Sequence, residues 1–249
     1  MKKKERTEAI ISALREAQTL SVQALSERFG VSVITIRKDL QQLESEGLVI
    51  RTFGGVTLGT NGDETYQSAY NRQRIADRIL EEIHEGDCII LNAGETTRLI
   101  ARGLLHFQRL RIITNSVYVT KELSEKKGFQ VIFLGGEMNA SAVFTFGPDA
   151  AAQLEQYRAD MLIISPSGLS HERGLTTRHP EAADLLRMMT LRANRIIIAA
   201  DERKIGYESF YHVCDTSKIS MLVTNTPASS HAQQELSELQ KSGIHIVLC

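Results

Sequence analysis

A basic helix face near the amino terminus is the first place where residue types and spacing point to chemistry. The segment SVITIRKDLQQLE begins at Ser32 and carries Thr35, Arg37 and Lys38 on the face opposite its apolar residues. Hydroxyl and cationic side chains in the first turns of a helix can contact base edges and phosphates in the major groove of duplex DNA. The same side chains also fit the solvated face of a helical hairpin, so the surrounding elements have to distinguish the two interpretations.

The flanking elements favour the DNA interpretation. Apolar residues at helical spacing predict two helices before this one, and Gly30 is placed to end the second of them. Ser32 can N-cap the third helix two residues later, which predicts a tight helix-turn-helix. The following segment, LVIRTFGGV, predicts a two-stranded wing that carries Arg51, and three lysines at positions 2–4 add a cationic arm.

A second candidate for chemistry is the segment LNAGETTR at 91–98. A predicted strand ends at Asn92, and Gly94 leads into Thr96 and Thr97 at the start of a predicted helix. Unpaired N–H groups at a helix start, together with hydroxyl groups, can hold a phosphate. A glycine turn between a strand and a helix is also a common structural device that needs no ligand.

Beyond residue 70 the sequence alternates apolar strands with amphipathic helices, which predicts an α/β domain with a mostly parallel sheet covered on both faces. The strand candidates are 87–92, 109–115, 129–135, 159–165, 195–201, 219–225 and 244–248, and the helix candidates are 72–83, 96–105, 117–126, 148–156, 181–192 and 229–241. Ligands of such sheets bind at the carboxyl ends of the strands. Several of these predicted ends carry polar or glycine residues, namely Asn92, Asn115, Gly135–Gly136, Ser165 and Asp201.

These patterns predict three parts. Residues 1–56 form a winged helix-turn-helix, the polar stretch 57–70 is a linker, and residues 71–249 form the larger α/β domain, in which we expect ligand binding and oligomerisation. The whole chain of 249 residues has a net charge of −1, with 42% hydrophobic and 24% charged residues, as in ordinary globular proteins. Residues 1–56 hold nine Lys and Arg against seven acids, so this part alone carries +2.

The remaining composition excludes several classes of protein. The sequence has no apolar run long enough for a membrane span or a signal peptide, so we expect a cytoplasmic protein. The cysteines Cys88, Cys214 and Cys249 are odd in number and widely separated, which fits neither a disulfide framework nor a zinc site. We expect all three to be reduced, and we expect neither a metal ion nor another cofactor.

The segment FGVSVITIRKDLQQLESEGLVIRTFGGV resembles the winged helix-turn-helix of the DeoR family of bacterial transcriptional regulators. Heads of that family carry a similar T-I-R-x-D-L…L…G-x-L…R-x-x-G-G run. The resemblance implies that Asp39 and Leu40 help to fix the helix, and for Asp39 we expect a cationic partner, Arg28 or Arg51. It also implies a set of DNA-contacting residues, namely Ser32, Thr35, Arg37, Lys38 and Arg51.

The rest of the chain resembles the DeoR effector domain, itself similar to ribose-5-phosphate isomerase, through LNAGETTR, ITNS, GGEMN, RGLTTRHPEAADLLRMM and IIIAADERKIG. As isolated residues, the polar residues of these segments are typical of turns and caps. Glu95 departs from the family's Asp/Asn-x-Gly-Ser/Thr-Thr turn, because a carboxylate there repels a dianion unless it points away or pairs with Arg98. The resemblance implies an effector pocket lined by Asn92, Gly94, Glu95, Thr96, Thr97, Asn115, Gly136, Arg178, Glu181 and Lys204.

Two functions compete. The resemblance implies that Glu181 occupies the region where the isomerase places its base. The isomerase also carries an Asp-Gly-Ala-Asp-Glu segment where this chain has SPSGLS, so Glu181 lacks the acidic partners that isomerisation requires. We therefore expect a regulator that is not an enzyme: a repressor of a carbohydrate-utilisation operon. Its expected partners are a double-stranded DNA operator, a sugar or sugar-phosphate effector, and further copies of itself in a dimer or tetramer. The alternative is a sugar-phosphate isomerase-like enzyme with an accessory DNA-binding head.

Overall fold

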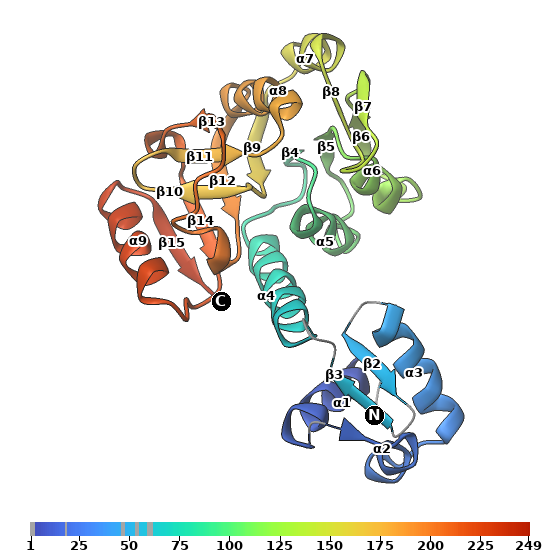
Figure 1. Ribbon diagram of the computed structural model, residues 1–249. Helices are drawn as coiled ribbons and strands as arrows, with labels where there is room; N and C mark the ends of the chain where they lie inside the picture. The colour runs from blue at the N-terminus through green and yellow to red at the C-terminus, as the bar shows by residue number, and fades with distance from the viewer. Residues whose placement is uncertain (1–2, 18, 46–47, 53–54, 59–61) are drawn as a thin grey trace. The chain divides into compact units, whose positions relative to one another are not determined.

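The computed structural model describes residues 3–17, 19–45, 48–52, 55–58 and 62–249 (Figure 1). It divides into two compact units, the first ending at Tyr70 and the second beginning at Asn71. Each unit has a hydrophobic core of its own, as separately folding domains do.

The first unit is a winged helix-turn-helix. Its elements are α1 (Lys3–Ala17), β1 (Thr19–Leu20), α2 (Val22–Phe29), α3 (Val33–Ser45), β2 (Val49–Thr52) and β3 (Gly55–Leu58). The strands form an antiparallel sheet of order β1-β3-β2, in which β2 and β3 are the predicted wing. Leu25, Ile36 and Leu40 are fully buried in the core of this unit, so the helical periodicity placed its inner residues correctly.

Local capping explains the short turn between α2 and α3. The Ser21 hydroxyl accepts a hydrogen bond from the Ala24 N–H at 3.0 Å and so starts α2. Gly30 ends that helix with a φ of 62°, a left-handed conformation that glycine adopts without steric cost. The stop at Gly30 was predicted from the sequence, and it brings α3 directly after α2.

The segment 57–70, predicted as a linker, contains regular structure. Its first two residues are the end of β3, and α4 (Gly62–Leu80) begins at residue 62. The division between the units falls within α4, after Tyr70. Residues 62–70 are helical, whereas the polar composition had indicated an irregular segment there.

The second unit is built on a seven-stranded parallel sheet of order β15-β14-β12-β9-β4-β5-β6. The seven strands match the seven predicted segments: β4 (Cys88–Leu91), β5 (Arg111–Thr114), β6 (Gln130–Phe133), β9 (Ala159–Ile164), β12 (Ala193–Ala199), β14 (Met221–Thr224) and β15 (His245–Leu248). The helices after α4 are α5 (Glu95–Leu104), α6 (Val117–Leu123), α7 (Pro148–Glu155), α8 (Pro180–Leu191) and α9 (Ser230–Lys241).

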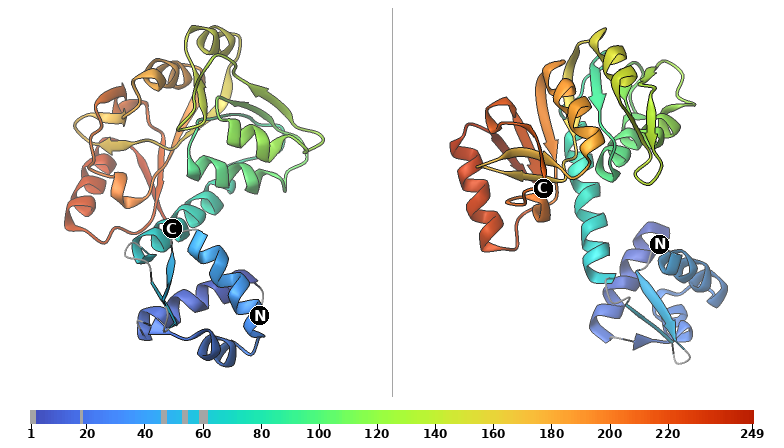
Figure 2. Two further views of the ribbon diagram at one scale, coloured as in Figure 1. Left: turned by 45° about the vertical axis from the view of Figure 1, so that its right-hand side comes forward. Right: turned by 45° about the horizontal axis from the view of Figure 1, so that its top comes forward.

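Apolar residues cover both faces of this sheet. In β4, Ile90 belongs to one core cluster, whereas Ile89 and Leu91 belong to the other, because successive side chains of a strand point to opposite faces. The first cluster includes residues of α7, α8 and α9, and the second includes residues of α4, α5 and α6. Figure 2 shows these helices around the sheet from two further directions. The prediction of a parallel sheet with two covered faces is confirmed.

Short antiparallel strands extend this scaffold and were not predicted. One small sheet has the order β10-β11-β13, formed by β10 (Gly168–Ser170), β11 (Gly174–Thr177) and β13 (Tyr211–Cys214). Another pairs β7 (Glu137–Asn139) with β8 (Phe144–Phe146). Two single-turn 3₁₀ helices, η1 (Glu202–Lys204) and η2 (Thr216–Lys218), complete the elements of this unit. Residues of β8, β11, β13 and η1 line the pocket described below.

Candidate functional site

The amino-terminal part of α3 presents the polar face expected of a recognition helix. Arg37 and Lys38 are exposed, and so is Ser32 at the start of the helix. The Ser32 hydroxyl accepts from the Thr35 N–H at 3.2 Å and lies 2.9 Å from the Thr35 hydroxyl, so it is the predicted N-cap. Arg51 lies in β2 with its side chain outside the described part of the structure.

Asp39 lies on the inner side of the same helix, where only 2% of its surface is exposed. Its partner in the described residues is Arg6 of α1, whose Nε donates to Oδ2 at 2.6 Å while Nη2 donates to Oδ1 at 3.3 Å. From the sequence we expected Arg28 or Arg51 in this role. Arg6 was not expected, because it is 33 residues away from Asp39 and no local spacing pattern connects the two positions. Asp39 therefore ties α3 to α1, as a residue that fixes the helix should.

The second unit contains a pocket of about 570 Å³ next to the carboxyl ends of β4, β5 and β9. Such a volume suits a small metabolite. Seven of the ten predicted effector residues line it, namely Asn92, Gly94, Glu95, Thr96, Asn115, Arg178 and Lys204. Lining residues that were not predicted include Arg72, Ser116, Tyr118, Ser167, Thr176 and Tyr207.

Asn92 and Ser165, which both line the pocket, connect the carboxyl ends of β4 and β9. The Ser165 N–H donates to Asn92 Oδ1 at 2.9 Å, and Asn92 Nδ2 donates to the Ser165 carbonyl at 3.2 Å. Lys204 Nζ then donates to the Ser165 hydroxyl at 3.1 Å. Because the amide of Asn92 is already engaged on both sides, its main role is to hold β4 and β9 together, whereas Lys204 presents a cation to the pocket.

Positive charge gathers around Lys204. Burial lowers the pKa of its ammonium group, the charge of Asp201 opposes this, and the charges of Arg72, Arg203 and Arg178 lower the pKa further. Asp201 is 2% exposed, and its pKa is lowered because Arg203 and Lys204 outweigh the effect of its burial. Arg72, Arg178 and Lys204 all line the pocket, so this side of it favours an anionic or strongly polar group.

Asn115 supplies an acceptor from the end of β5. Its Nδ2 donates to the Thr145 carbonyl at 2.9 Å, and the residue is 2% exposed. Among the described residues, none provides a hydrogen-bond donor to Asn115 Oδ1. A buried acceptor without a partner costs about 1–3 kcal/mol.

Three predicted residues do not line the pocket. Thr97 is fully buried and donates to the Gly94 carbonyl at 2.9 Å, which stabilises the turn into α5. Gly136 has a φ of 141°, and a Cβ there would collide with the Phe146 carbonyl, so the glycine permits close backbone approach. Glu181 accepts a hydrogen bond from Asn139 and lies 3.8 Å from His179 Nδ1. For these three residues the structural interpretation of the motif accounts for their placement.

Glu95 lies at the rim, and 61% of its side chain is exposed. The predicted partner Arg98 is 4.0 Å away, but its Nε donates to Glu122 at 2.8 Å and its guanidinium stacks over Tyr118 at 4.9 Å. Arg98 therefore compensates the charge of Glu95 only in part. The pocket has an acidic rim at Glu95 and a basic wall around Lys204.

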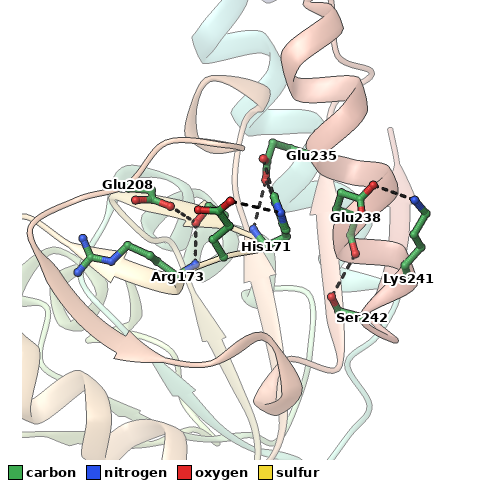
Figure 3. Close-up of polar contacts among 9 residues, drawn as sticks. His171, Arg173, Glu208, Glu235, Glu238, Lys241 and Ser242 are labelled. Atoms are coloured by element: carbon green, nitrogen blue, oxygen red, sulfur yellow. Dashed lines mark hydrogen bonds and ion pairs between the residues drawn. The ribbon is translucent and has the colours of Figure 1, made fainter.

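A second polar cluster ties the β10–β11 turn to α9 (Figure 3). His171 Nδ1 lies 3.0 Å from Glu235, and the His171 N–H donates to the same carboxylate at 3.2 Å. The Ser170 hydroxyl donates to Glu208 at 2.8 Å. Because β11 lines the pocket, these contacts fix one of its walls.

The part of the chain that the structure describes lacks two kinds of feature. No group of three or more His, Cys, Asp or Glu side chains there could hold a metal ion. No helix in that part of the chain combines the length and the apolar character needed to cross a membrane.

Comparison with protein families decides the class of the chain. The DeoR-like helix-turn-helix domain matches residues 6–61, and the DeoR C-terminal sensor domain matches residues 67–226. The chain belongs to the DeoR family. The resemblance inferred from the sequence is thereby confirmed for both units.

Relatives of this DeoR-family chain are transcription regulators. The repressor GlcR of Bacillus subtilis (strain 168) is 31% identical, with 90% of this chain and 89% of GlcR covered. The regulator GlpR of Haloferax volcanii is 29% identical over 98% of this chain and 96% of its own. The glycerol-3-phosphate regulon repressor of Escherichia coli (strain K12) is 26% identical, with 96% of this chain and 97% of that repressor covered. The chain is accordingly a DNA-binding regulator, and the enzyme alternative is not supported.

Similar solved structures include the ribose 5-phosphate isomerase A of Methanocaldococcus jannaschii, at 14% identity and a TM-score of 0.39 over 53% of this chain and 52% of the isomerase. Another is eIF2B beta of Chaetomium thermophilum, at 14% identity and a TM-score of 0.45, with 88% of this chain and 63% of eIF2B beta covered.

Proposed function

We propose that this DeoR-family regulator represses a carbohydrate-utilisation operon in the cytoplasm and changes its DNA affinity when a sugar or sugar phosphate occupies the pocket. The observation that carries the effector part is the set of three cationic side chains that line one pocket, Arg72, Arg178 and Lys204. A phosphate or carboxylate on a sugar suits these cations, and the hydroxyl groups of a sugar can form hydrogen bonds with the polar lining residues.

DNA contact is proposed for α3 and the wing. Ser32, Thr35, Arg37 and Lys38 occupy the start of α3, which is the part of a recognition helix that enters the major groove. Arg51 of the wing is proposed to contact the phosphate backbone. Because one helix-turn-helix unit covers few base pairs, we propose that two or four copies bind together on repeated half-sites.

The carboxylates at and near the pocket are not placed as the bases of an isomerase. Glu95 is the sole carboxylate among the described lining residues, and it lies at the exposed rim. Glu181, the residue expected near the position of an isomerase base, is engaged by Asn139 outside the lining. Proton abstraction needs a base within hydrogen-bond reach of a bound substrate, and neither carboxylate is placed in the enclosed part of the pocket.

Thermal unfolding of the full chain with a panel of neutral sugars and sugar phosphates tests the effector proposal. A ligand that binds only the folded protein stabilises it by about 2.7 kcal/mol at a hundred times its Kd. We expect Lys204→Ala to lose most of that shift, because the variant removes the ammonium group that faces the pocket. Lys218→Ala is the matched control, since Lys218 also ends a 3₁₀ helix but does not line the pocket.

Two outcomes contradict the proposal. Either no compound of the panel shifts the unfolding transition, or Lys204→Ala and Lys218→Ala respond as the wild type does. Operator binding of Lys204→Ala without ligand should equal that of the wild type, because the variant leaves the α3 residues unchanged. A loss of operator binding in this variant would place Lys204 in the DNA-binding function instead.

A further inference from the structure

Ile34 is an exposed aliphatic residue in the first turn of α3. Its exposed fraction is 67%, whereas Ile36 and Leu40 of the same helix are fully buried. The core cluster described for the first unit does not include it. An isoleucine that is 67% exposed gains little of the free energy that burial of its side chain would provide, so the stability of this unit does not explain the residue.

The position of Ile34 links it to the DNA-binding face. Ile34, Arg37, Lys38 and Gln41 are all exposed, and their spacing of three, four and seven residues from Ile34 places them on one stripe. Ile34 stands at the amino-terminal end of this stripe. That end of a recognition helix is the part that approaches base edges most closely.

We propose that Ile34 is a specificity-determining residue that contacts the C5-methyl group of a thymine in the operator. This inference rests on the proposed DNA contacts of α3. In the major groove thymine alone presents a methyl group, so an apolar contact there distinguishes thymine from the other bases. The β-branched side chain of Ile34 has few rotamers to lose when the contact forms.

The neighbouring cations make this contact useful. Arg37 and Lys38 can neutralise phosphates, and such contacts add affinity on any sequence. An aliphatic side chain adds nothing to that general attraction, but it excludes water from a methyl group that lies against it. The exposed stripe of α3 therefore joins residues for general affinity with one residue for base discrimination.

The test replaces thymine by uracil, which removes only the methyl group. An operator is first selected from random duplex DNA with the full chain, and each thymine is then replaced singly by deoxyuridine. We expect one position in each half-site where uracil weakens binding by the wild type about fourfold, the effect of one buried methyl group. Ile34→Ala should bind more weakly and show no penalty at that position.

Arg37→Ala is the matched control on the same stripe. It should lose affinity on every duplex and keep the uracil penalty, because Ile34 is still present. An equal uracil penalty in the wild type and in Ile34→Ala assigns the methyl contact to another side chain and overturns the proposal. Tolerance of uracil at every thymine by the wild type also overturns it.

Two further readouts separate other failures. If Ile34→Ala changes the mass of the assembly or lowers its melting temperature by several degrees, Ile34 packs against protein and the proposal is wrong. If selection enriches no sequence at all, the proposed operator binding itself fails. Enrichment without any uracil effect contradicts only the role of Ile34.

Discussion

Removal of the Asp39 carboxylate should lower the stability of α3 but leave the operator affinity of the folded protein nearly unchanged. In Asp39→Ala the Arg6 guanidinium loses a bidentate acceptor whose shorter hydrogen bond is 2.6 Å. A hydrogen bond to a charged group contributes about 1.5–3 kcal/mol, and the longer bond at 3.3 Å adds little. We therefore expect the free energy of opening of α3 to fall by about 2–3 kcal/mol, with Asp39→Asn between this variant and the wild type.

Hydrogen exchange measured by mass spectrometry can report this change locally. A loss of about 2–3 kcal/mol accelerates the exchange of α3 amides roughly 30- to 150-fold, while β4 and β9 in the other unit serve as the internal reference. The double variant Arg6→Met, Asp39→Leu should recover part of the loss, because neither charge then remains buried alone.

The DNA affinity of the folded Asp39→Ala protein gives the decisive comparison. A carboxylate that faced DNA would repel phosphates, so its removal would tighten operator binding. Because Asp39 is 2% exposed and bound to Arg6, we expect an affinity within about twofold of the wild type at fixed salt. Tighter binding together with unchanged exchange of α3 would refute the structural role of Asp39.

Two further predictions concern titration. The hydrogen bond to Glu235, followed by the charges of Glu235 and its acidic neighbours, raises the pKa of His171, so protonation of His171 favours the folded state. The decrease in melting temperature caused by His171→Asn should be largest below pH ~6.5 and should become smaller as the pH rises through the higher pKa of the folded state. A decrease that is equal at every pH contradicts this assignment. Burial raises the pKa of Cys214 to about 11, so at pH 8 iodoacetamide should label half-buried Cys249 before Cys214. Peptide mass mapping measures the two labelling rates, and the difference between them should disappear in urea. Equal native rates at the two cysteines would show that Cys214 is accessible.

The sequence predicted the large parallel sheet well because its strands are apolar on both faces and each is followed by a helical pattern or by a turn. The short strands were missed for a physical reason. Gly168–Ser170 and Gly174–Thr177 are too brief for a period of two to be visible, and β11 pairs with β13 about 35 residues further along the chain. Pairing over such a distance depends on the completed fold rather than on local composition.

Residues of the candidate site that directly follow a strand of the parallel sheet were predicted correctly, whereas some residues on other elements were not. Asn92 and Asn115 directly follow β4 and β5, and both line the pocket as the topology of parallel sheets requires. Glu181 lies on α8, and its orientation depends on the contact with Asn139 from a β-hairpin that was not predicted. Arg72 was missed because, in the helical pattern of α4, a cation at that position is indistinguishable from an ordinary surface residue.

Arg72 is also the lining residue with the most direct covalent connection to the DNA-binding unit. It lies on α4, and the first turns of that helix belong to the unit that ends at Tyr70. A ligand can shift an equilibrium only by its differential affinity for the two states, so tight binding alone would not regulate DNA affinity. Contacts to Asn115 or Lys204 lie on elements of the second unit alone, whereas a contact to Arg72 acts on a helix shared by both units. Under the proposed function, a contact of the effector with Arg72 is therefore the one that we expect to bear on operator affinity.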